Sequence, residues 1–269
     1  MIVDAHVHLW DRATDPQHWI DPQTMAAIDR DFGSPELAQM LDESGVDRAV
    51  VVQSVNDIGE TGRLLARRDP RIAGIVGWID VAGDVTAQLA AFNGSPGRLV
   101  GVRHLAHVDP DPQWLRRPDV GAGLDTLGAF DLAFDLVVRS SQLGVAARVA
   151  AEHPSVRFVL DHLGGVAETD DVEAWERDFR DLAQHGNVTA KVSGLWRIDD
   201  ELEVRRIVGV AVEAFGPSRL LYGSDWPLAR LGVDAPRWRR RVDDAIVGLG
   251  DAERSELWSG TATRVYRLA

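Results

Sequence analysis

The stretch IVDAHVHLW at residues 2–10 alternates in polarity and predicts a β-strand near the start of the chain. Successive side chains on a strand point to opposite faces, so this strand has one face rich in polar groups and one apolar face. The first face is expected to hold Ile2, Asp4, His6 and His8, and the second Val3, Ala5, Val7 and Leu9. The apolar face suits packing on helices, and the other suits the lining of an interior.

The rest of the chain repeats a short apolar run followed by a longer segment with helical spacing. The predicted strands are Ile2–His8, Arg48–Ser54, Ile72–Asp80, Leu99–His104, Leu132–Val137, Val156–His162, Val188–Ser193 and Leu220–Asp225. The predicted helices lie near Ser34–Ser44, Glu60–Arg68, Val85–Phe92, Val120–Leu127, Gln142–Glu152, Val172–Gln184, Glu201–Phe215 and Pro236–Leu249.

This strict alternation predicts an α/β protein with a parallel sheet and right-handed crossovers. Eight strand–helix units close into a (β/α)8 TIM barrel of roughly 250 residues. The alternative is an open doubly wound sheet, which usually has a glycine-rich turn after its first strand, where this chain has His-Val-His-Leu-Trp. We therefore predict a single-domain barrel over residues 1–269, with a long loop at about 9–33 beside the active site.

The composition excludes several classes of protein. The chain has 269 residues, of which 45% are hydrophobic and none is cysteine, so disulfides, thiolate metal sites and a cysteine nucleophile are excluded. A formal net charge of −13 without basic runs argues against nucleic acid or an anionic membrane surface as a partner. No apolar stretch approaches the ~20 residues that span a bilayer, and no secretory signal is visible. We expect a cytoplasmic protein.

In a TIM barrel the catalytic groups lie at the carboxyl ends of the strands. Nearly every predicted strand ends in a polar or ionisable side chain, although strand ends are often polar simply because they leave the core. These side chains are His6 and His8, Gln53, Asp80, Arg103 and His104, Asp135, Asp161 and His162, Lys191 and Ser193, and Asp225.

The candidates for metal binding and for a general base lie on the first and last predicted strands. Two imidazoles at positions i and i+2, His6 and His8, can converge on one cation such as Zn²⁺. Asp225 could activate a water molecule as general base or bind the same metal. The alternative for Asp225 is a helix-capping or turn aspartate, which the sequence Ser-Asp-x-Pro also suits.

The fourth and sixth strands supply further candidates for catalysis. Arg103 offers a planar fork for a carboxylate or an oxyanion, and His104 could donate a hydrogen bond or a proton. Because the two are neighbours on a strand, only one is expected to face the interior. His162 precedes two glycines that leave room for a ligand, although His162 or Asp161 could instead be a hydrogen-bonded core group.

Substrate binding is assigned to polar strand ends and to tryptophans near them. The tryptophans of the long loop could stack on a sugar-like ring, or could merely fold the loop onto the barrel. Lys191, the only lysine in the chain, suggests a need for a compact ammonium group. The candidate substrate-binding residues are Trp10, Trp19, Gln53, Asp135, Lys191 and Trp226.

Five stretches resemble the amidohydrolase superfamily: DAHVHLWD (4–11), GVRH (101–104), LDHLG (160–164), KVSGL (191–195) and YGSDWP (222–227). The likeness covers essentially the whole chain. It is greatest to the sugar-lactonase branch, which includes L-fuconolactonase- and L-rhamnonolactonase-like enzymes and is related to 2-pyrone-4,6-dicarboxylate lactonase.

The resemblance implies a (β/α)8 hydrolase that opens a sugar-acid lactone by attack of water on the ring carbonyl. It implies metal binding by His6, His8, His162 and Asp225. Three departures argue against a binuclear centre: Arg103-His104 replaces the bridging lysine, Asp135 replaces a metal-binding histidine, and Ser141 stands where many lactonases of the branch have a histidine. One divalent ion, with Zn²⁺ favoured, is therefore expected, and activity without it stays open.

In the predicted mechanism Asp225 takes a proton from water, while Arg103, His104 or a single Zn²⁺ polarises the carbonyl. The expected partner is a small-molecule sugar-acid lactone, and homo-oligomer formation is left open. One alternative is a decarboxylase or another metal-dependent hydrolase of a small carboxylic acid on the same scaffold. A second is a sugar-acid binding protein without catalytic activity.

Overall fold

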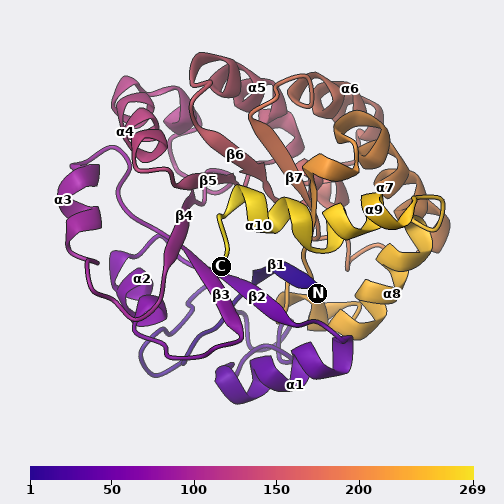
Figure 1. Cartoon of the computed structure of the whole chain (residues 1–269), viewed down its shortest axis with the longest axis horizontal. Coiled ribbons are helices and arrows are strands. Elements are labelled where there is room, and N and C mark those ends of the chain that lie inside the picture. The colour runs from indigo at the N-terminus through magenta and orange to yellow at the C-terminus, as the bar shows by residue number, and fades with distance from the viewer.

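The computed structural model describes residues 1–269 and confirms the predicted barrel (Figure 1). All eight strands pair in parallel in the order β1 to β8, and a bridge between Val7 and Trp226 joins the last strand to the first. The strands are β1 (Val3–Val7), β2 (Arg48–Val52), β3 (Ile72–Gly77), β4 (Leu99–His104), β5 (Ala133–Leu136), β6 (Arg157–Leu160), β7 (Val188–Val192) and β8 (Leu220–Tyr222). Closure leaves no exposed sheet edge.

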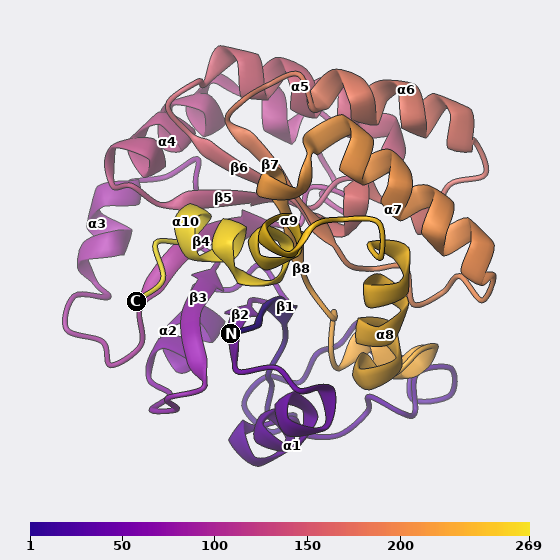
Figure 2. The same ribbon diagram turned by 45° about the vertical axis from the view of Figure 1, so that its right-hand side comes forward.

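Ten α-helices pack on the barrel, most of them around its outer side (Figure 2). They are α1 (Ser34–Ser44), α2 (Ile58–Leu65), α3 (Val85–Ala90), α4 (Pro118–Ala129), α5 (Leu143–Glu152), α6 (Val172–Leu182), α7 (Glu201–Phe215), α8 (Ala235–Ala245), α9 (Asp251–Ser255) and α10 (Thr261–Val265). Helices α1 and α7 have the predicted bounds, whereas α9 and α10 were not predicted. None of the helices is long and apolar enough to cross a bilayer.

Several strands end earlier than predicted because the chain turns sharply at the site. The sixth strand was predicted to reach His162 and the eighth Asp225, but β6 ends at Leu160 and β8 at Tyr222. His162 and Asp225 have φ values of 53° and 60°, in the left-handed region, which no strand residue adopts. The turns therefore redirect these two side chains.

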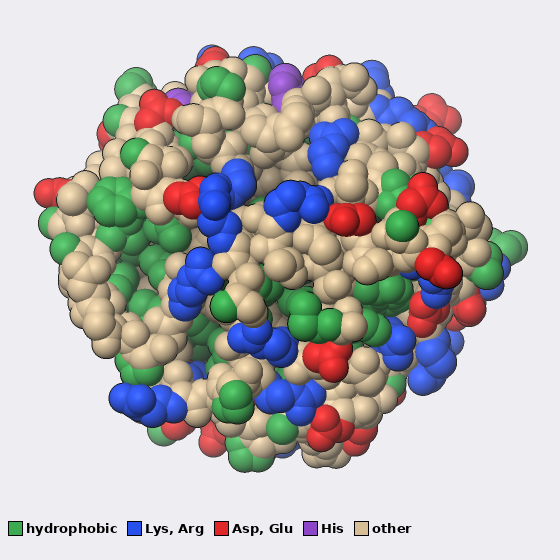
Figure 3. Space-filling view, in the orientation of Figure 1, with side chains coloured by type: hydrophobic (Ala, Val, Ile, Leu, Met, Phe, Trp, Pro, Cys, Tyr) green, Lys and Arg blue, Asp and Glu red, His purple; other side chains and the backbone are tan.

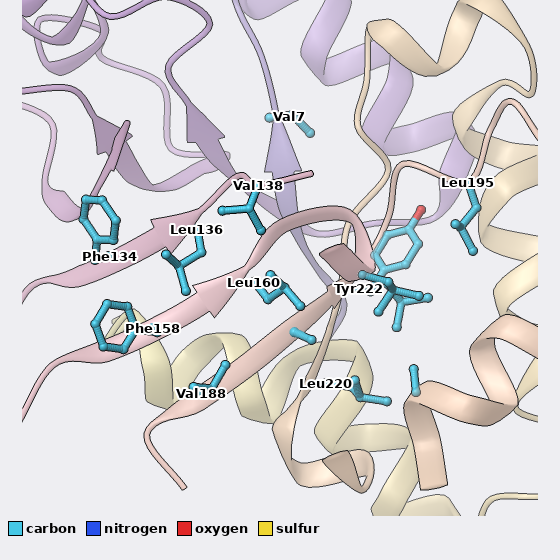
Figure 4. Packing of buried hydrophobic residues seen from close by; sticks show 14 of the residues in the cluster. Val7, Phe134, Leu136, Val138, Phe158, Leu160, Val188, Leu195, Leu220 and Tyr222 are labelled. Atoms are coloured by element: carbon cyan, nitrogen blue, oxygen red, sulfur yellow. The ribbon is translucent and has the colours of Figure 1, made fainter. Parts of the chain in front are cut away.

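Two separate hydrophobic cores position the site. The larger core fills the layer between the sheet and the helices, as Figure 4 shows for side chains such as Phe134, Phe158 and Tyr222. The smaller core of 12 residues draws on seven different strands and on α10, which places it inside the barrel. This inner core fills the barrel below the candidate site.

The uniform alternation predicted for the first strand is wrong. Val3 and Ala5 belong to the inner core, whereas Val7 and Leu9 belong to the outer core. The pairing register of β1 with β2 shifts between Asp4 and Val7, so an irregularity in β1 exchanges its two faces. As a result His6 and His8 face the interior above an apolar layer.

The amino-terminal end of the barrel is closed by α10, which crosses it close to both chain termini (Figure 1). Arginine side chains gather across this face in Figure 3. Two of the arginines hold the carboxyl-terminal segment: Arg48 donates to the Ala269 carbonyl at 2.6 Å and Arg98 to the Arg267 carbonyl at 2.5 Å. The site must therefore open at the opposite end.

Candidate active site

A cavity of about 410 Å³ is lined by residues at the carboxyl ends of the strands and in the loops that follow them. Its size is within the range of ~300–1,000 Å³ that is typical of small-molecule sites. Its polar lining includes His8, Arg103, Asp161, His162 and Asp225. The structure thus brings together residues from four strand ends that are far apart in the sequence.

His6, His8 and Asp225 form the first cluster. The two Nε2 atoms of the histidines lie 3.1 Å apart, and Oδ1 of Asp225 lies 3.8 Å from Nε2 of His6 and 3.5 Å from Nε2 of His8. Nδ1 of His8 is 2.8 Å from the Val52 carbonyl. Because a carbonyl oxygen can only accept, His8 carries its proton on Nδ1 and directs the lone pair of Nε2 into the cluster.

These residues fit one divalent cation. Two nitrogens that each lie about 2.0–2.1 Å from a cation are roughly 3 Å apart, which matches the separation of the two histidines. Oδ1 of Asp225 is buried without a hydrogen-bond donor, and the three ligand atoms lie within 4.8 Å of one another. His6 can present the same lone pair when its Nδ1–H points to Asp161, 3.3 Å away.

Asp225 is held as a carboxylate. Burial alone would raise its pKa, but the neighbouring imidazoles of His162, His6 and His8 together lower the pKa below the ordinary range of an aspartate. Its second oxygen, Oδ2, accepts a hydrogen bond of 2.6 Å from Nε1 of Trp196. One oxygen is therefore fixed by the protein while the other stays free.

A second cluster of His6, Asp161 and His162 does not fit a cation in the same way. Both oxygens of Asp161 already have cationic partners: Nζ of Lys191 lies 2.8 Å from Oδ1, and Nη1 of Arg103 lies 2.9 Å from Oδ2. These charges hold the pKa of Asp161 well below its usual value although burial alone would raise it. Two side-chain cations occupy the surroundings that a second metal ion would need.

Beneath this cluster lies a buried chain of polar side chains. Nζ of Lys191 lies 2.5 Å from Oδ2 of Asp135, and the hydroxyl of Tyr266 donates to the same carboxylate at 2.8 Å. Lys191, Asp135 and Tyr266 are each at most 1% exposed. Burial raises the pKa of Asp135 to about 6, against the lowering effect of Lys191. Tyr266 belongs to the residues just after α10, so the carboxyl-terminal segment contacts the polar layer below the site.

His162 is oriented by two residues from the end of β7. Its Nδ1 lies 2.9 Å from the hydroxyl oxygen of Ser193, and its ring centroid lies 4.5 Å from that of His6. A Cβ atom on Gly194, where φ is +73°, would lie only 2.5 Å from Cβ of His162. The glycine is therefore required for His162 to lie over the cluster.

Arg103, and not His104, faces the cavity. The Arg103 guanidinium bonds to Asp161 and to the carbonyl of Gln53, and its Nη1 lies 3.3 Å from Nε2 of His6. His104 points to the outer layer, where it lies 2.7 Å from a carboxylate oxygen of Asp109 and stacks on Trp114 with ring centroids 3.6 Å apart. The catalytic role expected of His104 is not supported by this position.

Of the six residues expected to bind substrate, only Trp19 lines the cavity. Trp10 is fully buried and donates to the Arg30 carbonyl at 2.8 Å, and Trp226 packs on Phe32. Gln53 donates to the Arg103 carbonyl at 3.1 Å, and Asp135 and Lys191 lie below the cavity. These five residues pack against the site without lining the cavity. Inward-facing side chains lie at different heights along the barrel axis, and only those near the carboxyl ends of the strands reach the cavity.

Sequence reasoning missed six polar or aromatic side chains of the cavity: Ser54, Asn56, His107, Glu168, Trp196 and Arg197. Ser54 is the last residue of a predicted strand, and the other five follow the predicted strand ends. The clearest signal was available for Trp196, which directly follows the stretch KVSGL.

Comparison with known proteins identifies the family. The sequence model of the amidohydrolase family described as "Amidohydrolase" matches residues 3–268. The chain belongs to this family. An L-fucono-1,5-lactonase of Burkholderia ambifaria is 36% identical over 99% of this chain and 95% of that enzyme. A second, from Burkholderia multivorans, is 32% identical over 99% of this chain and 96% of that enzyme.

Solved structures agree with this assignment. The crystal structure of an amidohydrolase from Burkholderia multivorans with bound zinc has a TM-score of 0.91 and 32% identity, and covers 100% of both chains. A second crystal form of that protein, with bound HEPES, has a TM-score of 0.92. The 2,6-dihydroxybenzoate decarboxylase with its substrate has 15% identity and a TM-score of 0.72, so it shares the fold alone.

Proposed function

We propose that this amidohydrolase opens the lactone of a sugar acid, a six-membered aldonolactone, to the free acid. The observation that carries the proposal is the position of Asp225: a buried carboxylate with one unbonded oxygen, beside two imidazoles and a guanidinium at the base of a cavity. The relatedness to two L-fucono-1,5-lactonases supports the choice of a lactone as substrate.

Asp225 and Arg103 have separate roles in the reaction. Oδ1 of Asp225 accepts a proton from a water molecule, and the water oxygen bonds to the lactone carbonyl carbon. Arg103 stabilises the negative charge that develops on the carbonyl oxygen, because its guanidinium is fixed by Asp161 and need not reorganise. The C–O bond of the ring then breaks, and the proton held by Asp225 passes to the departing ring oxygen.

His6, His8 and Asp225 would hold one divalent cation, and we propose Zn²⁺ because a related protein binds zinc and two of the ligands are imidazoles. Such an ion would act as a Lewis acid on the carbonyl oxygen. His162 lies over the same cluster, and we propose that it contacts the substrate rather than the ion, since both oxygens of neighbouring Asp161 are already engaged by cations.

The aromatic side chains of the cavity suit a sugar ring. Trp196 is fixed by its hydrogen bond to Asp225, and Trp19 approaches from the loop between β1 and α1. Indole faces pack well on the apolar faces of sugars. We propose that these two tryptophans contact the lactone ring and position its carbonyl near Asp225.

The test is a pH-indicator screen of aldonolactones, including L-fucono-1,5-lactone, with the wild type and the Asp225→Asn variant. Each ring opening releases a titratable acid. The wild type is expected to accelerate at least one lactone, and Asp225→Asn is expected to lower kcat by on the order of 10²–10⁴. The same assay with Arg205→Gln, a change of an exposed side chain, is the control.

Two outcomes would contradict the proposal. Near-normal turnover by Asp225→Asn would remove Asp225 from the mechanism. Binding of a sugar acid without turnover of any lactone would favour a binding protein.

A further inference from the structure

His107 is the single polar side chain on one wall of the cavity. That wall is formed by the segments after β4 and β5, and its other members are Leu105, Val108, Val137 and Val138. In the closed strand order, β4 lies opposite β8, whose end leads to Asp225. His107 therefore meets a bound ligand on the side away from the proposed base.

Neither ring nitrogen of His107 is satisfied by the protein. Nδ1 is buried without any hydrogen-bond partner, and Nε2 makes no hydrogen bond to the protein although the residue lines the cavity. A buried N–H without an acceptor costs more than a buried lone pair that a weakly polar environment tolerates, so the proton is best placed on Nε2. Burial, followed by the charge of Arg103, lowers the pKa of His107 to about 4, which keeps the ring neutral near pH 7.

The backbone around His107 is fixed at three points. The His107 N–H donates to the Val137 carbonyl at 3.2 Å, and Nε of Arg139 donates to the His107 carbonyl at 2.7 Å. The side-chain amide of Gln142 donates to the Ala106 carbonyl at 3.2 Å. A loop held in this way presents the imidazole in a defined position, which is what recognition of a ligand group requires.

We propose that Nε2–H of His107 donates a hydrogen bond to a ring hydroxyl of the lactone and thereby selects hydroxylated lactones over unsubstituted ones. The inference rests on the proposed lactonase function. A hydroxyl oxygen is the acceptor that a sugar lactone offers on the side away from its carbonyl. The other side chains of this wall are apolar and cannot replace the imidazole as a donor. Without His107, the hydroxyl group of a bound lactone would therefore have no hydrogen-bond partner here.

The test compares two substrates, L-fucono-1,5-lactone and δ-valerolactone, which has the same ring size and no hydroxyl groups. His107→Phe is expected to lower the ratio of their kcat/KM values about tenfold, mainly through the KM of the sugar lactone. His107→Gln restores an N–H donor and is expected to recover part of the ratio. Val108→Ala, on the same wall, is the matched control and should leave the ratio within twofold of the wild type, as an apolar contact does not distinguish hydroxyl groups.

Two results with active enzyme would overturn the inference. An equal loss for both substrates would mean that His107 acts on the reacting atoms or on the fold, and an unchanged ratio would mean that it contacts no hydroxyl.

If the wild type opens no lactone, the proposed function fails, and His107 is tested separately by calorimetric titration with L-fuconate. A Kd about tenfold weaker for His107→Phe than for the wild type would support hydroxyl recognition. Equal affinities, or no binding to the wild type, would overturn it.

Discussion

Nζ of Lys191 lies 3.1 Å from Nδ1 of His6, and neither side chain is exposed to solvent. The ammonium also contacts Asp135 at 2.5 Å and Asp161 at 2.8 Å, so its positive charge is paired with two buried carboxylates. A charge buried at 0% exposure persists only when it is paired in this way. Lys191 therefore links the imidazole of the first strand to the carboxylates of β5 and the turn after β6.

Lys191→Met is expected to destabilise the fold by roughly 3–5 kcal/mol, because it leaves two buried carboxylates without their shared cation. Urea unfolding followed by tryptophan fluorescence measures this change. Arg205→Met is the control: it removes an exposed pair with Asp244 at 3.8 Å and should change the free energy of unfolding by less than about 0.5 kcal/mol. Equal effects of the two substitutions would contradict the role assigned to Lys191.

The enzyme is expected to bind one divalent cation per chain rather than two. Elemental analysis after loading with Zn²⁺ and removal of excess metal measures the stoichiometry. His8→Ala should lower Zn²⁺ affinity at least tenfold, because it removes one ligand of the first cluster. His162→Ala should still bind one ion. Two ions per wild-type chain would show that Lys191 and Arg103 do not prevent binding at the second cluster.

Gly194→Ala is expected to displace His162, since the added methyl group would lie 2.5 Å from Cβ of His162 and the φ of +73° is unfavourable for alanine. We expect a destabilisation of about 1–2 kcal/mol and a fall in kcat/KM. Gly186→Ala, where nothing lies within 4 Å of the added atom, is the matched control. Normal kcat/KM in Gly194→Ala would mean that the position of His162 does not matter for the reaction.

The stability of the wild type relative to His107→Phe is expected to fall as the pH falls from about 6.5 to about 4. The unfolded chain binds a proton at His107 near the ordinary value of 6.5, whereas the folded chain resists protonation until about 4. Across this pH range the free energy of unfolding of the wild type falls by up to about 3 kcal/mol relative to that of the variant, which has no imidazole at this position. Below pH 4 the difference in free energy of unfolding between the wild type and the variant should be constant. Urea unfolding at several pH values tests it, and a difference that does not vary with pH would contradict a neutral, buried His107.

Much of the fold follows from local sequence patterns. The bounds of α1 and α7 were predicted correctly because capping signals and helical spacing lie within each segment. The short carboxyl-terminal helices were missed, since α9 and α10 have five residues each and show no long periodic pattern. Their positions depend on packing across the barrel end.

The site was predicted less completely than the fold. His6, His8, His162, Arg103 and Asp225 were correctly expected at one end of the barrel, because strand order and chain direction are sufficient to say so. Alternation along a strand could not show that Asp135 and Lys191 lie below the cavity or that His104 faces outward. These facts depend on the stagger of neighbouring strands and on the irregularity in β1.

By itself the sequence determined that eight strands alternate with helices and that their ends carry histidine, aspartate and arginine. Only the tertiary structure decided which of these side chains meet, at what depth, and with which partners. The reason is physical: hydrophobic periodicity is a property of neighbouring residues, whereas a distance of 3.1 Å between His6 and Lys191 joins residues 185 positions apart. Such contacts are fixed by closure of the barrel and by the packing of its layers.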